Sequence, residues 1–187
     1  MRMRMLLAGA ALTAASFAAA GAAQAQVFVI DTPSATRCSM AANAPMRDDA
    51  SISRCTLAID SDGLVGRNLA GTYTNRGVLK LRAGDASAAM ADFDTALGMD
   101  ESLGEAWIDR GAGLLAQARY DEAIQAVSRG LPLTRRGHEM AYYIRAVARE
   151  NLNDDAGAYR DFTQASRTAP AWDAPRTDIA RFEVRPR

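Results

Sequence analysis

The sequence has little of what a catalytic or metal site needs. Its 187 residues include one histidine, His138, and two cysteines, and aromatic residues make up only 6%. A lone histidine has neither a partner nucleophile nor further ligands with which to form such a site. Basic and acidic residues balance at 22 each, so the chain lacks the basic excess of nucleic-acid binders. We expect no catalysis, no metal, no cofactor and no nucleic-acid partner.

What the chain has in quantity is alanine and other small apolar residues, within a hydrophobic share of 49%. Small apolar side chains suit closely packed helices, whereas sheets favour β-branched and aromatic residues. Apolar residues also recur at helical spacing over most of the sequence. The composition and the spacing together predict an all-α protein.

Residues 1–25 are typical of a signal peptide. Arg2 and Arg4 give a positive start, residues 5–20 are apolar, and Ala23-Gln24-Ala25 supplies the small residues of a cleavage site. We expect cleavage after this tripeptide and export to the periplasm, or secretion. An uncleaved helix that anchors the chain in a membrane is the alternative. After cleavage we expect no stable membrane insertion, because no later apolar run is long enough to span a bilayer.

An internal repeat is the strongest signal in the sequence. Tyr73-Thr74-Asn75-Arg76-Gly77 matches Trp107-Ile108-Asp109-Arg110-Gly111 in its aromatic, arginine and glycine positions. A third copy follows at an offset longer by one residue, which places Tyr142 opposite Trp107. A period of about 34 residues is typical of one helix–turn–helix unit. The sequence therefore predicts three successive helical hairpins.

These units resemble the tetratricopeptide repeat (TPR). Each has an aromatic residue at the fourth position of the repeat and a large residue at the twenty-fourth, where Phe93, Val127 and Phe162 stand. Small residues at the eighth and twentieth positions let two antiparallel helices approach closely. Six residues carry this packing role: Gly77, Ala89, Gly111, Ala123, Ala146 and Ala158.

The resemblance implies a right-handed α-solenoid with modified ends. We expect a degenerate half-repeat before the three units, with its helix near residues 51–59, and before it an arm that reaches Thr36 and is either loose or ordered on contact. A capping helix after the units should lay Ile179 and Phe182 over the last one. The expected segments are 1–25 (signal peptide), 26–69 (arm and half-repeat), 70–103, 104–137 and 139–172 (TPR units) and 173–187 (capping helix and tail).

Cys38 and Cys55 stand too far apart in the sequence for the Cys-x-x-Cys motif of a redox enzyme. Exported proteins meet an oxidising compartment, where an even pair of cysteines commonly forms a disulfide. The alternative is two buried thiols that act as small core residues. We expect the disulfide.

Arginine recurs at the seventh position of each unit, as Arg76, Arg110 and Arg145, where the TPR family usually has an aliphatic residue. Asp92 and Asp161 follow the first and third of these arginines by sixteen residues, on the partner helix. We interpret them as Arg–carboxylate pairs that fix the register of two helices. A ladder of arginines that binds acidic ligands is the alternative.

The resemblance also implies a binding surface, because the first helix of each TPR unit lines a concave face. This face would be mostly apolar with acidic edges, and it would suit a peptide with apolar side chains and some basic character. The alternative is that the N-terminal arm, with its apolar residues 27–30, fills the face. The residues expected there are Thr74, Val78, Leu81, Glu105, Ile108, Leu115, Met140, Tyr143, Val147 and Glu150.

The sequence therefore predicts a non-enzymatic, exported protein–protein interaction module, which binds a peptide or protein segment in the concave face. A role as an adaptor in cell-envelope assembly fits this prediction. A permanently buried structural subunit of a larger complex is the alternative, and an enzyme with an unrecognised site is a remote one.

Overall fold

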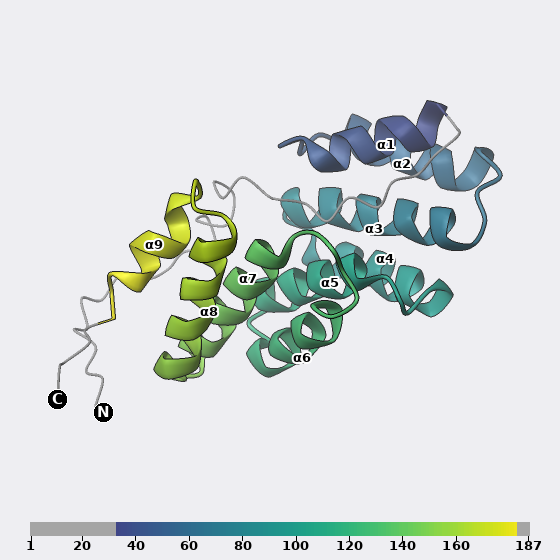
Figure 1. Ribbon diagram of the computed structural model, residues 1–187. Coiled ribbons are helices and arrows are strands. Elements are labelled where there is room, and N and C mark those ends of the chain that lie inside the picture. The colour runs from purple at the N-terminus through teal and green to yellow at the C-terminus, as the bar shows by residue number, and fades with distance from the viewer. Residues whose placement is uncertain (1–32, 183–187) are drawn as a thin grey trace, which may run out of the picture.

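The computed structural model describes residues 33–182, and within that range it contains nine α-helices and no strand (Figure 1). The expected signal peptide, residues 26–32 of the arm and the tail at 183–187 lie outside the described residues. The helices are α1 (Pro33–Asn43), α2 (Asp49–Ser61), α3 (Gly66–Arg82), α4 (Ala86–Met99), α5 (Gly104–Ala116), α6 (Tyr120–Gly130), α7 (His138–Asn151), α8 (Asp155–Thr168) and α9 (Asp173–Ile179).

The helices pack as a row of hairpins. The pairs α3 and α4, α5 and α6, and α7 and α8 make the most extensive contacts, and α4–α5 and α6–α7 contacts join each pair to the next. The first helices of successive pairs also touch, α3 with α5 and α5 with α7. Figure 1 shows the pairs following one another along the array. The fold is an α-solenoid, as the sequence predicts.

Each hairpin turns at one residue with a positive φ. These residues are Gly84 (93°), Ala118 (57°) and Asn153 (61°), which stand at equivalent places of the three units. Glycine and asparagine adopt this conformation readily, whereas alanine adopts it at a cost from its Cβ. Aspartates then start two of the second helices, since Asp85 accepts a hydrogen bond from Ala88 N and Asp154 from Gly157 N.

Small residues bring the two helices of each hairpin together. A Cβ on Gly77 would lie 2.5 Å from Phe93 Cε1, and one on Gly111 would lie 2.5 Å from Val127 Cγ2. In the third hairpin Ala146 packs in one buried cluster with Phe162. The small eighth residue of each unit therefore makes room for the large twenty-fourth residue.

The N-terminal hairpin differs from the expectation. The sequence predicted one helix near residues 51–59 after an arm that reaches Thr36, whereas Pro33–Asn43 form a complete helix, α1, paired with α2. Proline is well placed at the first position of a helix. The inner face of α1 is buried, and Cys38 and Ala42 form one cluster with Leu79 of α3. The half-repeat is thus a full hairpin.

A disulfide between Cys38 and Cys55 joins α1 to α2, and both cysteines are buried. Cys55 stands one repeat period before Ala89, at the place where the later units have a small residue. The disulfide therefore lies where the other hairpins bring their two helices together.

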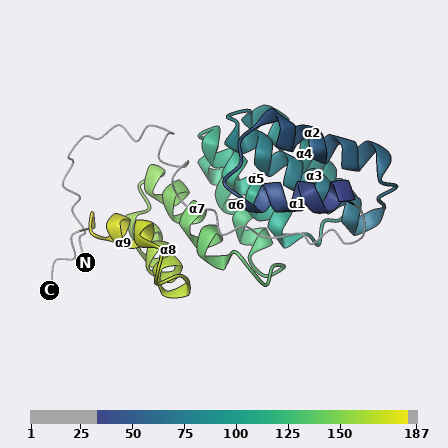
Figure 2. The same cartoon turned by 90° about the horizontal axis from the view of Figure 1, so that it is seen from above.

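The other end of the array is closed by α9. Phe182, just after this helix, packs with Ala158 and Phe162, and Ile179 joins the same cluster. Pro175 lies in the first turn of α9 and is buried. These residues cover the last unit in the way expected of a C-terminal capping helix. From above, α1 and α2 lie at one end of the array and α9 at the other (Figure 2).

Candidate functional site

Three of the ten residues expected on the concave face are buried: Thr74, Ile108 and Leu115. Ile108 is 2% exposed and belongs, with Leu115, to the central core cluster of the array. Ile108 also lies beside Gly130 of α6, since a Cβ on that glycine would be 3.0 Å from Ile108 Cγ1. The expectation that these three side chains line an open surface was therefore wrong.

Two further residues of the expected set are covered by the C-terminal cap. Tyr143 packs against Trp172 with ring centroids 4.8 Å apart and the ring planes tilted by 48°, and its hydroxyl forms a hydrogen bond with Asp178 of α9. Arg181 Nη2 donates to Glu150 Oε2 at 2.8 Å. Burial raises the pKa of both Tyr143 and Glu150. Both side chains therefore hold α9 in place.

The other five expected residues are half-buried: Val78, Leu81, Glu105, Met140 and Val147. The four apolar ones pack at the border of the central core cluster. Glu105 accepts a hydrogen bond from Thr134 Oγ1 at 2.9 Å. These residues stay candidates for contact with a partner.

Polar residues that the sequence analysis did not single out lie beside them. Asn75, Val78 and Arg82 follow one another at intervals of three and four, so they share one face of α3. Asn75 Nδ2 and Arg82 Nη2 are buried and have no hydrogen-bond partner among residues 33–182, while Arg82 Nη1 donates to Ala44 O at 2.6 Å. Unpaired buried donors are rare in folded proteins because each costs free energy.

Asp109 brings a carboxylate from α5 into the same region. It stands one repeat period after Asn75 and is half-buried. Burial raises the pKa of Asp109 to about 7, against the opposing effect of Arg82, and nearby Glu105 raises it further. Burial also lowers the pKa of Arg82, which Asp109 partly offsets. We call Asn75, Arg82, Glu105 and Asp109 the polar cluster.

A signal for this cluster was present in the sequence. Asn75 and Asp109 directly follow the buried Thr74 and Ile108, at equivalent places of two units. One residue along a helix turns the side chain by about 100°. Two polar residues one repeat period apart, each next in sequence to a buried residue, therefore indicate the helix face that borders the core.

The arginines of the first and third units form the expected pairs. Arg76 Nε and Nη2 donate to the two oxygens of Asp92 at 2.9 and 2.7 Å, and Arg145 does the same to Asp161 at 2.8 and 2.9 Å. Each aspartate also pairs with a second cation four residues after the arginine. These second cations are Lys80 and Arg149, both at 2.8 Å.

Arg110 pairs differently from the other two arginines. Its Nε donates to Asp94 of the preceding hairpin at 2.7 Å, because Ala126 stands where the other units have an aspartate. Leu114 likewise takes the place of the second cation, so in this unit apolar residues replace the buried charges. All three arginines are engaged with carboxylates within the fold, which supports their structural role.

No group of three or more histidine, cysteine, aspartate or glutamate side chains in residues 33–182 has the arrangement of a metal site. His138 lies at the start of α7, and its Nε2 is 3.0 Å from the carbonyl oxygen of Thr134. Among the described helices, none is both long and apolar enough to cross a membrane.

Comparison with known proteins supports the fold. No family model matches the sequence, and no curated protein matches it either. Among solved structures, a crystal structure of MamA superposes with a TM-score of 0.61 over 80% of this chain and 82% of that chain, at 16% sequence identity. At this identity the likeness concerns the fold alone. Together with the repeated hairpins, the likeness fits a TPR-type helical repeat.

Proposed function

We propose that this protein is an exported, non-enzymatic interaction module that binds a peptide segment across the first helices α3, α5 and α7. The observation that carries the proposal is the polar cluster, in which Asn75 Nδ2 and Arg82 Nη2 are buried donors without an acceptor in the described part of the chain. A fold gains nothing from leaving such donors unpaired, whereas a ligand that brings an acceptor to them gains affinity.

The chemistry of the face fits an extended peptide. Asn75 and Arg82 offer donors to peptide carbonyl oxygens, and Glu105 and Asp109 offer acceptors to backbone N–H groups or a basic side chain. Half-buried apolar residues border these groups and provide contact for alternate side chains of the peptide. They are Val78, Leu81, Met140 and Val147.

Two observations support export as part of this proposal. Residues 1–25 have the charge and hydrophobicity pattern of a signal peptide. The disulfide between Cys38 and Cys55 suits an oxidising compartment such as the periplasm. Sequencing of the protein recovered from a periplasmic fraction should give Gln26 as the first residue. A first residue of Met1 would contradict cleavage.

The binding proposal is tested by selecting peptides from a random library on the immobilised protein. Selected peptides should lose affinity for Asn75→Ala and Asp109→Ala variants. They should bind unchanged to Asn68→Ala and Asp121→Ala, which remove the same side chains from exposed positions on α3 and α6. Equal affinity for all four variants would place the binding surface elsewhere.

A second arm of the experiment addresses the N-terminal segment. If residues 26–32 fill this face, as the alternative interpretation of the sequence has it, their deletion should raise the affinity of the selected peptides. If the face is open, the deletion should leave the affinity unchanged. The same peptides serve for both arms, so differences between libraries do not enter.

A further inference from the structure

The N-terminal end of the array carries an apolar cavity that no described helix covers. The cavity measures about 390 Å³ and lies on α1, the first turns of α2 and the loop between them. Met40 is 66% exposed and Met46 39%, and both side chains lie on this one surface. The residues that line it are Arg37, Met40, Ala41, Ala44, Met46 and Arg54.

This end contrasts with the other. At the C-terminal end α9 and Phe182 cover the last hairpin, whereas the outer side of α1 faces solvent (Figure 1). Repeat arrays need a polar outer face at each end, since an uncovered apolar face invites association. An exposed methionine surface is typical of sites that adapt to a partner, because the methionine side chain is flexible and polarisable.

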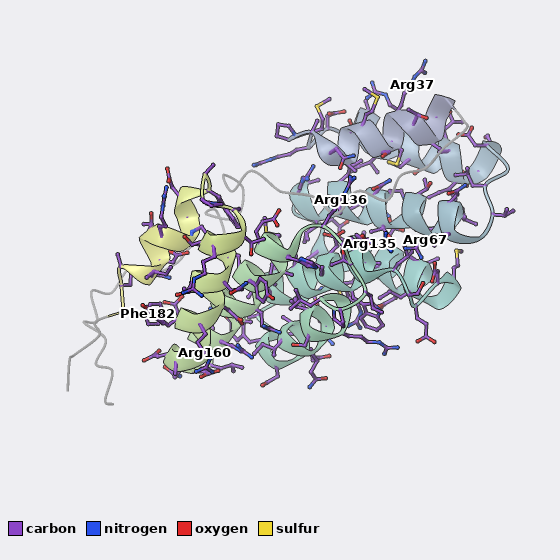
Figure 3. All side chains as sticks on the ribbon, in the orientation of Figure 1. Arg37, Arg67, Arg135, Arg136, Arg160 and Phe182 are labelled. Atoms are coloured by element: carbon purple, nitrogen blue, oxygen red, sulfur yellow. A yellow bond between two sulfur atoms is a disulfide. The ribbon has the colours of Figure 1, made fainter. Side chains whose placement is uncertain are left out.

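The charges at the cavity have one sign. Arg37 and Arg54 are the charged residues that line it, and both are exposed. Neither forms an ion pair with a described residue. The Asp48 carboxylate is engaged by Ser51, whose backbone N–H is the main reason that its pKa is lowered, and the charge of Arg54 lowers it further as the smallest contribution. Figure 3 shows Arg37 on the side of α1 that faces away from the array.

These features set the chemistry of the partner. The lining offers two guanidinium groups and otherwise apolar side chains, so an extended peptide would leave most of its backbone groups without hydrogen bonds. A helix satisfies its own backbone and presents a stripe of side chains. We propose that this cavity is a second docking surface, for an amphipathic helix of another protein with carboxylates beside its apolar stripe.

Charge also decides against a second copy of this chain. A symmetric pair of copies would place the same surface on both sides and bring Arg37 and Arg54 of one copy toward those of the other. Like charges that meet in an apolar interface are unfavourable, whereas a carboxylate from a partner would give a charge-assisted pair with each arginine. The surface meets the polar cluster at one point, because Arg82 donates to the carbonyl oxygen of Ala44, which lines the cavity, but its charged residues belong to α1 and α2.

The test uses two synthetic helical peptides with the same leucine stripe, one with glutamates beside the stripe and one with lysines. Fluorescence anisotropy should show that the protein binds the glutamate peptide and not the lysine peptide. The Arg37→Glu, Arg54→Glu double variant should lose at least about tenfold in affinity for the glutamate peptide and gain affinity for the lysine peptide. Met40→Ser should weaken binding of whichever peptide binds.

Arg160→Glu with Arg167→Glu is the matched control, since both arginines are exposed on α8 at the other end of the array (Figure 3). This double variant should bind the glutamate peptide as the parent does. No binding of either peptide, or equal binding of both, would overturn the proposal. Self-association that Met40→Ser abolishes would make a second copy the occupant, and binding that appears only after deletion of residues 26–32 would make that segment the occupant.

Discussion

Arg145 of α7 and Asp161 of α8 form a two-point pair, with Nε 2.8 Å from Oδ2 and Nη2 2.9 Å from Oδ1. Arg149 adds a third contact to Oδ2 at 2.8 Å, and Asp161 is almost fully buried. The same arrangement occurs in the first unit, with Asp92 at its centre. In both units one buried carboxylate holds two cations that would otherwise face each other.

The first prediction concerns this carboxylate. Asp161→Ala leaves Arg145 half-buried without a counter-charge and Arg149 with only its 3.7 Å contact to Asp154, and we expect the free energy of unfolding to fall by about 3–5 kcal/mol. Asp94→Ala removes the partner of Arg110, but the Asp94 side chain is 57% exposed, so this change should cost less than about 1 kcal/mol. Denaturant unfolding of both variants measures the difference. Equal losses would show that burial of the pair does not matter.

The second prediction compares two helical glycines. Gly77→Ala places a Cβ 2.5 Å from the buried Phe93 ring, so we expect a loss of about 1–3 kcal/mol from strain. Gly98 lies on α4, and a Cβ added there would have no atom within 4 Å. We therefore expect Gly98→Ala to stabilise the protein by about 0.5–1 kcal/mol. Thermal melting of the two variants should therefore shift in opposite directions. A rise in melting temperature for Gly77→Ala would mean that the hairpin has room to relax.

The third prediction follows from the raised pKa of Asp109. An unfolded chain has an aspartate pKa near about 3.9, whereas in the fold the value is about 7. Between these values the folded state holds the proton that the unfolded state has lost, so stability falls as pH rises toward about 7 and then levels off. In the Asp109→Asn variant this side chain does not ionise, so its contribution to the loss of stability with rising pH disappears.

Melting temperatures at about pH 5 and about pH 8 give the measurement. The advantage of Asp109→Asn over the parent should be larger at the higher pH, where the parent must bury a charged carboxylate. Asp121→Asn, at an exposed position of α6, should show no such change. An advantage that does not vary with pH would contradict the raised pKa.

The fourth prediction concerns the disulfide. The Cys38→Ala, Cys55→Ala double variant frees a loop of 17 residues in the unfolded chain, and we expect a loss of about 3 kcal/mol. A reducing agent should lower the parent to the same stability and leave the variant unchanged. Thiol labelling of the denatured, non-reduced parent should detect no free cysteine. Two labelled thiols per chain would mean that the pair is not bridged.

The sequence predicted the hairpins well because their determinants repeat. The aromatic, arginine and glycine of the first unit recur in the second, and the small residues recur in all three units, so each copy supports the others. The pairing of Arg76 with Asp92 could also be predicted, since an arginine and an aspartate recur at the same separation in the third unit. The partner of Arg110 could not be predicted, because Asp94 precedes Arg110 in the sequence and belongs to another hairpin.

The helix α1 was missed because it has no repeated counterpart. Ser39 stands one repeat period before Tyr73, where the repeat would require an aromatic residue. Nothing local then distinguishes a packed helix from a loose alanine-rich arm. Its packing comes from contacts with α2 and α3 and from a disulfide, which are tertiary features.

The candidate site was predicted only in part, for a geometric reason. Family positions assign a residue to a face only if the rotation of each helix about its own axis is known to better than one residue. One residue corresponds to a turn of about 100°. Ile108 is buried in the central core cluster, whereas its neighbour Asp109 belongs to the polar cluster. The sequence also could not show that α9 covers Tyr143, because α9 has no counterpart in the other units.

The two ends of the array are held by different kinds of bond, so local unfolding should begin at one end and not at the other. The helices α1 and α2 are joined covalently through Cys38 and Cys55, whereas α9 is held by ring contacts and by the Arg181–Glu150 pair. In an array stabilised between neighbours, fraying begins at the end with the weaker attachment. Amide hydrogens should therefore exchange first in α9 and α8 and last near the disulfide. A partner that binds α1 would thus hold the protein by the end that opens last.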